Sequence, residues 1–213
     1  MQWEKLLSTQ KLFEEPKEPE VFGKYPINEF EKDYNRIISS AAFRRLQDKT
    51  QVFPLDKSDF VRTRLTHSIE TSTIARQLGI MATQNNTKYL PEDILKEYAE
   101  GIPSVLLCAG LLHDLGNPPF GHFGETVIGD WFKENLPVIK YKGKPIKEWL
   151  DPQMITDLEN FEGNAQALRI VLKAKYNSEI NLSAGIISTL VKYPTNSLSF
   201  ERKHPDIKKH KPG

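Results

Sequence analysis

The sequence predicts an all-α fold, and three observations carry this prediction. Apolar residues recur three or four positions apart over several long stretches, which is the period of an amphipathic helix. Residues 104–112 are apolar almost throughout, as in a helix that is buried on all sides. The alternation of apolar and polar residues that marks a half-buried strand is weak. We therefore expect a helical bundle with residues 104–112 in its core.

The N-terminal part of the chain is expected to form an arm followed by a helix. Residues 1–27 include three prolines and little periodicity, so they are predicted to be an extended arm. Four apolar residues are expected to attach the arm to the domain, namely Trp3, Leu6, Leu7 and Phe13. A helix is predicted over residues 28–49, and residues 53–59 are predicted to be a loop. The apolar stripe of this helix consists of Phe30, Tyr34, Ile37, Ile38, Ala41 and Leu46.

A second helix is predicted over residues 66–84. The stripe along it consists of His67, Glu70, Ile74, Leu78 and Met81, spaced mostly three or four apart. Polar residues at the start of an apolar stripe are unusual, and they draw attention to His67.

The remaining elements follow the core helix. Pro103 suits the first turn of that helix, and the Gly-Asn-Pro-Pro segment at 116–119 ends it. Further helices are predicted over residues 123–136, 155–176 and 182–192, with a turn at 141–145. We expect one main domain over residues 28–200 and a basic tail over residues 201–213.

Composition excludes several classes of protein. Hydrophobic residues make up 38% of the chain and charged residues 27%, which is typical of a soluble globular protein. The net charge of +1 gives no overall attraction to nucleic acid or membranes. Cys108 is the single cysteine, so a disulfide framework is excluded and a buried core position is expected. With no signal-peptide pattern and no apolar segment long enough to span a bilayer, a cytoplasmic protein is expected.

Two metal-ligand residue types stand together where the core helix ends. His113 and Asp114 follow its apolar run directly. Burying an ionised aspartate is costly without compensation, and a divalent cation that binds carboxylate and imidazole together supplies it. The alternative is a helix-end pair whose polar groups are satisfied by the backbone.

His67 gives this pair a third partner. Alone, a histidine near a helix start is usually a packed or capping residue. Together with His113 and Asp114, however, His67 can form three corners of a metal site with open positions for water.

A second histidine–carboxylate pair follows shortly afterwards. His122 and Glu125 are three residues apart, so a helix that starts there places them on one face. A carboxylate can orient an imidazole for proton transfer. The alternative is a first helical turn in which Glu125 is favoured by the helix dipole.

Several long motifs resemble the deoxyguanosine triphosphate triphosphohydrolase family of the HD superfamily, and they occur in the family's order. They are Phe43-Arg44-Arg45-Leu46-Gln47 to Gln51-Val52-Phe53, Arg62-Thr63-Arg64-Leu65-Thr66-His67-Ser68, His113-Asp114-Leu115-Gly116-Asn117-Pro118-Pro119-Phe120-Gly121-His122, Phe161-Glu162-Gly163-Asn164-Ala165-Gln166 and Val191-Lys192-Tyr193-Pro194. The resemblance covers most of the chain from about residue 30 onward. It implies an HD-domain helical bundle.

The resemblance also implies an activity and a set of site residues. The activity is the metal-dependent hydrolysis of a deoxynucleoside triphosphate to the deoxynucleoside and inorganic triphosphate. The implied metal ligands are His67, His113 and Asp114, and the implied catalytic pair is His122 with Glu125. The implied substrate-binding residues are Gln51 at the sugar 3′-hydroxyl, Arg64 and Lys192 at the phosphates, and Asn164 and Tyr193 in the nucleotide pocket. A highly anionic triphosphate needs fixed cations, and Arg64 lies one helical turn from His67.

One family motif is missing. The HD site is completed by a downstream aspartate in an Asp-Ile-Ala-Tyr-like motif, and the late candidates Asp151, Asp157 and Asp206 lack this context. We therefore expect an N-terminal fragment that binds metal weakly and is itself inactive, whereas the full-length form is a homo-oligomer. The metal stays open among manganese, magnesium, iron, zinc, cobalt and nickel.

Two other functions stay open. One is another HD nucleotide phosphohydrolase, although the 3′-hydroxyl contact implied for Gln51 argues against it. The other is a non-catalytic module that binds nucleotides or single-stranded DNA, with the basic tail as a contact. A solvated tail without such a role is the simpler interpretation.

Overall fold

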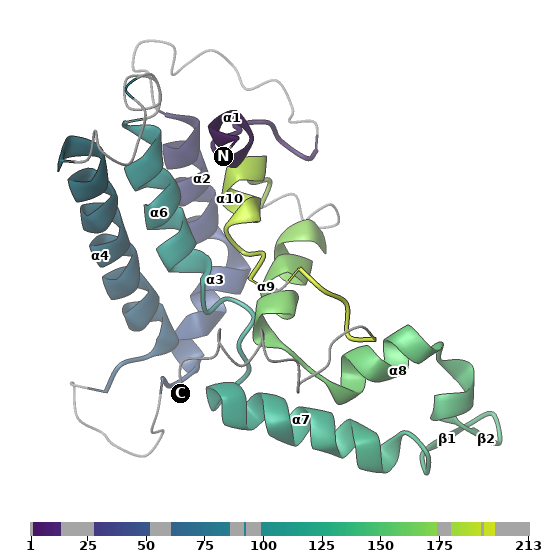
Figure 1. Ribbon diagram of the computed structural model, residues 1–213. Helices are drawn as coiled ribbons and strands as arrows, with labels where there is room; N and C mark the ends of the chain where they lie inside the picture. The colour runs from purple at the N-terminus through teal and green to yellow at the C-terminus, as the bar shows by residue number, and fades with distance from the viewer. Residues whose placement is uncertain are drawn as a thin grey trace. The chain divides into compact units, whose positions relative to one another are not determined.

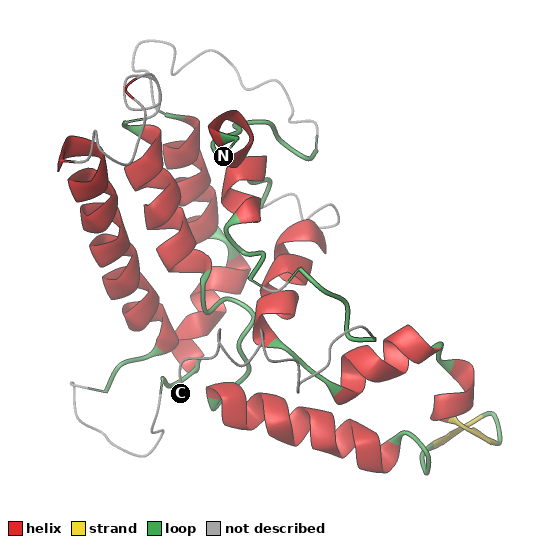
Figure 2. Ribbon diagram, viewed as in Figure 1, coloured by secondary structure: helices red, strands yellow, loops and turns green. Residues whose placement is uncertain are grey.

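The prediction of a mostly helical protein is correct. The computed structural model describes residues 2–13, 28–51, 61–85, 92, 99–173, 180–192 and 194–198. Within these ranges the structure is helical apart from loops and one hairpin of two short strands (Figures 1 and 2). The chain divides into two compact units, and each is described by itself. Unit 1 consists of Met1–His122 and Glu162–Lys192, and unit 2 consists of Phe123–Phe161 and Tyr193–Gly213.

Unit 1 is built around the predicted core helix. This helix, α6 (Gly101–Leu112), lies between α4 (Arg64–Asn85) and α2 (Glu29–Ser39) in Figure 1. The other elements of the unit are α1 (Trp3–Leu6), α3 (Ala41–Arg44), the 3₁₀ helix η2 (Arg45–Asp48), α9 (Gly163–Leu172) and α10 (Ala184–Ser188). Cys108 is fully buried in α6, and burial raises the pKa of its thiol to about 12. The expected core position of this cysteine is confirmed.

The helix predicted over residues 28–49 is divided into three pieces. The backbone of Ser40 is extended, with φ −71° and ψ 145°, which ends α2. The Ser40 hydroxyl then accepts a hydrogen bond from the Phe43 backbone N–H (3.2 Å) and caps α3. Ile37 and Leu46 are buried as expected, whereas Ala41 is exposed. The apolar period therefore runs across a break in the helix, because the Ser40 side chain competes for a backbone N–H and starts a new helix there.

The stripe predicted along α4 lies on the exposed side of the helix. The side chains of Ile74, Leu78 and Met81 are each more than half exposed. Small residues cover the buried side instead, and a Cβ added at Gly110 of α6 would lie 2.4 Å from the Ser72 Cα. The two helices are therefore too close for large side chains between them. Close backbone packing, rather than burial of the largest apolar residues, decides which face of α4 is inside.

Within unit 1, the predicted extended arm is helical at α1, and buried ion pairs attach the arm to α2. Asp33 of α2 is fully buried and is paired with Lys11 and with Arg36 (3.0 Å). The other Asp33 carboxylate oxygen accepts from the Ser183 backbone N–H (2.9 Å) and from its hydroxyl. Of the four apolar anchors predicted in the arm, Leu7 is buried, Trp3 packs on the core and Phe13 is half-buried, but Leu6 is 42% exposed.

The predicted helix over residues 155–176 is also two helices. The first, α8 (Pro152–Glu159), belongs to unit 2 and is capped by the Asp151 carboxylate, which accepts from the Met154 backbone N–H (2.8 Å). The second, α9, starts with Glu162 as its N-cap. Of the predicted helix over 182–192, α10 occupies Ala184–Ser188.

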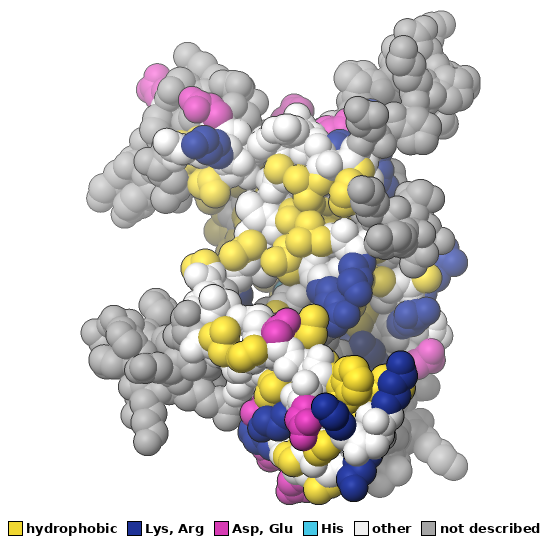
Figure 3. Space-filling model, turned by 90° about the vertical axis from the view of Figure 1, so that its right-hand side faces the viewer, with side chains coloured by type: hydrophobic (Ala, Val, Ile, Leu, Met, Phe, Trp, Pro, Cys, Tyr) yellow, Lys and Arg dark blue, Asp and Glu magenta, His cyan; other side chains and the backbone are white. Residues whose placement is uncertain are grey.

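Unit 2 also contains most of α7 (Gly121–Asn135), a hairpin of β1 (Lys140–Tyr141) and β2 (Lys144–Pro145), and the 3₁₀ helix η3 (Ile146–Trp149). The hairpin replaces the predicted turn at 141–145, and both residues between its strands have positive φ. The exposed rings of Tyr141 and Trp149 meet edge to face at 5.7 Å, with basic residues around them. Figure 3, which views the molecule from the side of the hairpin, shows basic and apolar side chains close together in its lower part.

Candidate metal centre

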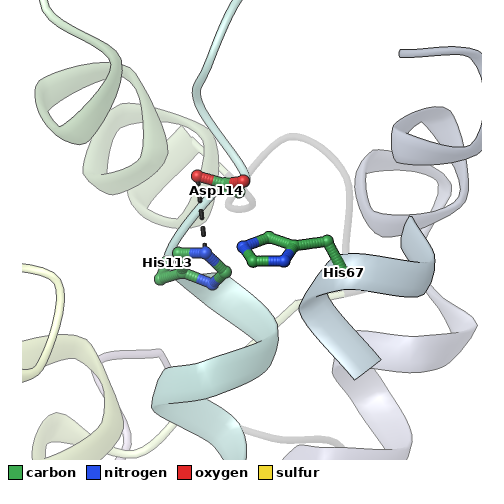
Figure 4. A group of neighbouring side chains, drawn as sticks. All are labelled: His67, His113 and Asp114. Carbon is green, nitrogen blue, oxygen red and sulfur yellow. Dashed lines mark ion pairs between the residues drawn. The ribbon is translucent and has the colours of Figure 1, made fainter. Parts of the chain in front are cut away.

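The three predicted metal ligands come together in unit 1. His67 projects from the first turns of α4, His113 follows the last residue of α6, and Asp114 is in the turn beyond it (Figure 4). One ligand atom from each lies within 4.8 Å of the others. The two imidazole rings are 5.2 Å apart and inclined by 67°. No other cluster of this kind occurs among the residues that the structure describes.

The backbone of α6 orients the His113 ring. Its Nδ1 lies 2.8 Å from the Gly110 carbonyl oxygen, which can only accept a hydrogen bond. Nδ1 therefore carries the proton, and in the neutral ring the lone pair is on Nε2. That Nε2 atom lies 3.5 Å from Oδ1 of Asp114. A proton on Nε2 or a bound cation between the two atoms would each satisfy this contact, and a histidine whose Nδ1–H is held by a backbone carbonyl is typical of a metal ligand.

Two donors hold the Asp114 carboxylate. Arg64 Nη1 donates to Oδ2 at 2.8 Å, and both side chains are more than nine-tenths buried. The Asn117 side-chain amide donates to Oδ1 at 2.6 Å. These contacts offset part of the desolvation of the carboxylate and fix its direction.

Lys49 lies directly after η2, and it contacts the same turn that carries the Asp114 carboxylate. Its ammonium donates to the Asn117 backbone carbonyl (2.8 Å), and its own carbonyl accepts from the Arg64 backbone N–H (2.8 Å). Burial lowers the pKa of Lys49, the nearby charges of Arg64 and Arg45 lower it further, and Asp114 opposes them. Sequence reasoning assigned no role to Lys49 or Asn117. The three-residue spacing from Asp114 was a usable signal for Asn117, but nothing local indicated Lys49.

The turn after Asp114 is packed closely against α9. A Cβ added at Gly116 would lie 2.0 Å from the Gly163 carbonyl oxygen, so only glycine fits there. At the same end of α9, the side-chain amide of the predicted pocket residue Asn164 donates to Glu162 (2.6 Å). The helix start that carries Asn164 is thereby fixed beside the turn that carries Asp114.

The donor set fits a divalent cation. Two imidazole nitrogens and one carboxylate oxygen suit first-row metals such as manganese, iron, cobalt and zinc. Metal–ligand bonds of about 2 Å place ligand atoms on opposite sides of an ion about 4 Å apart. The three ligand atoms here lie within 4.8 Å of one another, which is close to that distance. Which metal binds is left open by this set.

The predicted substrate-binding residues have different surroundings. Gln51 is half-buried, and its side-chain oxygen is buried without a hydrogen-bond partner in the described structure. Its backbone N–H donates to the Arg62 carbonyl (3.2 Å), which keeps it beside the start of α4. The Arg64 Nε is also buried without a partner, although Nη1 is bound to Asp114. Lys192 is exposed, and Tyr193 lies outside the described residues.

The predicted catalytic pair lies on one helix. His122 and Glu125 are one turn apart in the first turns of α7, where His122 is exposed and Glu125 is buried. The chain enters this helix through two residues with positive φ, Phe120 (66°) and Gly121 (56°). A non-glycine residue in this conformation is uncommon, and such strain is found at functional sites more often than elsewhere.

The late aspartates have other contacts. Asp151 caps α8, and Asp157 accepts from Gln153 (2.7 Å) and from the Ser197 hydroxyl (2.6 Å) within unit 2. Asp206 lies outside the described residues, as does the whole basic tail. None of the described helices combines the length and the apolar character needed to cross a membrane.

Comparison with known proteins identifies the family of the chain and its relatives. The profile of the HD domain matches residues 64–189, which include all three predicted metal ligands. A deoxyguanosinetriphosphate triphosphohydrolase-like protein of Listeria monocytogenes is 50% identical over 217 residues, covering 98% of this chain and 46% of the relative. A probable deoxyguanosinetriphosphate triphosphohydrolase of Pseudomonas aeruginosa is 43% identical, covering 76% of this chain and 33% of the relative. A deoxyguanosinetriphosphate triphosphohydrolase of Klebsiella pneumoniae is 38% identical, covering 81% of this chain and 38% of the relative. The chain thus spans less than half the length of each of these relatives.

Proposed function

The chain belongs to the HD domain family, and from this premise we propose that it carries the metal centre of a deoxynucleoside triphosphate triphosphohydrolase. The reaction would release the deoxynucleoside and inorganic triphosphate. The observation that carries the proposal is the convergence of His67, His113 and Asp114, with an oriented imidazole facing a fixed carboxylate. The relatives' names, which specify deoxyguanosinetriphosphate triphosphohydrolases, support the choice of substrate class.

The residues would divide the chemistry between them. His67, His113 and Asp114 would hold a divalent cation, which when bound polarises a phosphate oxygen and helps to place a water molecule. His122, oriented by Glu125 one turn further on, would transfer a proton to the leaving 5′-oxygen. Buried Glu125 would keep the imidazole in one orientation rather than react itself.

Two of the buried polar atoms that have no hydrogen-bond partner among the described residues support the substrate contacts. The Gln51 side-chain oxygen can accept a hydrogen bond from a sugar 3′-hydroxyl, and the Arg64 Nε–H can donate to a phosphate oxygen. Exposed Lys192 would add a positive charge for the triphosphate, and Asn164 and Tyr193 would line the nucleotide pocket. A buried polar atom that is left unsatisfied is costly, so a substrate that completes it gains affinity.

Product analysis tests the proposal. The full-length gene product and the 213-residue chain would each be incubated with the four dNTPs and Mn²⁺, and inorganic triphosphate would be separated by ion exchange. We expect triphosphate from the full-length product and its loss in His122→Ala with the fold intact. Release of pyrophosphate or monophosphate would instead identify another HD nucleotide phosphohydrolase.

Nucleotide binding without any product would indicate a non-catalytic module. Unchanged turnover in His122→Ala would refute the role of that residue.

Other properties stay proposals. We propose manganese, magnesium or another transition metal as the bound ion, a cytoplasmic location, and a homo-oligomer for the full-length form. Single-stranded DNA is a further candidate partner, favoured by the exposed Tyr141–Trp149 pair among the hairpin lysines. Salt-sensitive retention on single-stranded DNA would support it, and no retention at low salt would exclude it.

A further inference from the structure

We propose that Lys49 is a positioning residue that joins the two segments of the candidate metal centre and sets its metal affinity. This inference rests on the proposed function, because it concerns the same site. It gives Lys49 a role that does not require contact with the metal or with the substrate.

Both Asp114 oxygens are held, Oδ1 by the Asn117 amide at 2.6 Å and Oδ2 by Arg64 at 2.8 Å. The position of the carboxylate therefore depends on two segments, the turn at 114–117 and the first residue of α4. These segments are far apart in the sequence, so something must keep them in register.

Lys49 makes a hydrogen bond to each segment. Its carbonyl accepts from the Arg64 backbone N–H at 2.8 Å, at the first residue of the helix that carries His67. Its ammonium donates to the Asn117 carbonyl at 2.8 Å, across 68 residues of sequence. A single residue thus connects the helix of one histidine ligand with the turn of the carboxylate ligand. Among the described residues, only Lys49 and Asp114 form hydrogen bonds with both Arg64 and Asn117.

The chemistry of this contact explains why a lysine suits the position. A half-buried ammonium that donates to a carbonyl makes a charge-assisted hydrogen bond, which is stronger than a neutral one. The long side chain reaches the turn while the backbone stays paired with α4. Methionine has a similar length but no donor, whereas arginine keeps a cationic donor.

Metal affinity separates positioning from direct phosphate contact. If Lys49 only attracted phosphate, its loss would raise the KM for the nucleotide and leave Mn²⁺ binding unchanged. If it positions Asp114, its loss weakens Mn²⁺ binding in the absence of nucleotide. Partners of metal ligands typically change metal affinity about 10- to 100-fold when they are removed.

The experiment is a Mn²⁺ titration followed by electron paramagnetic resonance, on the 213-residue chain and on the full-length product. We expect Lys49→Met to weaken binding about 10- to 100-fold and Lys49→Arg to restore it to within about 3-fold of wild type. Arg45→Met is the matched control, because it removes a charge near Lys49 from an exposed side chain and should leave the affinity unchanged. Far-UV circular dichroism would check the fold of each variant.

The outcomes distinguish this inference from the proposed function. Equal Mn²⁺ affinity in wild type and folded Lys49→Met would overturn the inference alone. A wild-type protein that binds no Mn²⁺ in either form would overturn the proposed metal centre, and the inference with it. If Lys49→Met does not fold, Lys49→Gln tests the same contact, because it removes the charged donor to the Asn117 backbone carbonyl while keeping a polar side chain. Unchanged Mn²⁺ affinity in Lys49→Gln would also overturn the inference.

Discussion

Asp33 and Asp114 are both buried carboxylates in unit 1, yet their surroundings differ in kind. Asp33 is fully enclosed by two cationic side chains and two donors from Ser183, so its charge is balanced within the protein. Asp114 has one cationic partner, Arg64, and faces the His113 Nε2 at 3.5 Å. The first arrangement is complete without a ligand. In the proposed metal centre, a cation between the carboxylate and the imidazoles would complete the second arrangement.

This difference shows why burial alone does not identify a functional carboxylate. A buried aspartate that is saturated by lysine, arginine and backbone donors holds segments together, as Asp33 holds the N-terminal arm against α2 and residue 183. A buried aspartate beside an imidazole that the backbone orients, as Asp114 is beside His113, offers an oxygen and a ring nitrogen to a shared cation. The type of neighbour decides between a structural and a metal-binding role.

The largest expected effect is on stability at Asp33. Asp33→Ala should lower the free energy of unfolding by about 3–5 kcal/mol, because it leaves the charges of Lys11 and Arg36 without their buried partner. Urea denaturation measures this change. Asp130→Ala is the control, since its pair with Lys133 is exposed and should change stability by no more than about 0.5 kcal/mol. A loss below about 1 kcal/mol at Asp33 would mean that the buried cluster is not structural.

The second prediction concerns metal binding at the two aspartates. Mn²⁺ should raise the melting temperature of wild type and Asp33→Asn but not of Asp114→Asn, because of these two aspartates only Asp114 belongs to the proposed metal site. At a metal concentration 100-fold above Kd the gain corresponds to about 2.7 kcal/mol. Differential scanning fluorimetry with and without Mn²⁺ makes the measurement. A Mn²⁺-dependent gain that survives in Asp114→Asn would contradict the assignment of this carboxylate.

The smallest expected effect is the pH dependence of stability at Glu29, which shares the partner Lys11 with Asp33. Burial acts to raise the pKa of Glu29, but hydrogen bonds and charge from Lys32 and Lys11 outweigh it, so the pKa lies below its ordinary value of 4.5. A lowered carboxylate pKa stabilises the fold above pH 4.5, and this contribution is lost as the pH falls through the folded-state pKa. The stability difference between wild type and Glu29→Gln, from urea denaturation, should therefore be constant above pH 4.5 and shrink below it. A difference that does not change with pH would contradict this sign.

The sequence predicted the positions of the helices better than the residues at which they begin and end. The period of apolar residues located α2, α4, α6 and α7, because it reflects burial along each helix. It did not show the break at Ser40, where a side chain competes for the backbone, or the break before Glu162. It also assigned the wrong face of α4, since the period of Ile74, Leu78 and Met81 is helical but these residues are exposed.

The candidate site was predicted to a similar extent. The residue types of His67, His113 and Asp114 and the order of their motifs were enough to propose a metal site, and the structure brings the three together. Nothing in the local pattern of Lys49 indicated that its ammonium reaches the carbonyl of Asn117. A contact across 68 residues depends on how two segments pack, and no short-range pattern records it.

By itself, the sequence determined which segments are helical, which residues can bind a metal, and which family motifs they form, because periodicity, side-chain chemistry and motif order are properties of the chain. Only the tertiary structure decided that Arg64 and Asn117 hold Asp114, that Asp33 is enclosed by Lys11 and Ser183, and that small residues bring α4 close to α6. These are relations between distant segments, and they exist only once the backbones have packed at a particular separation.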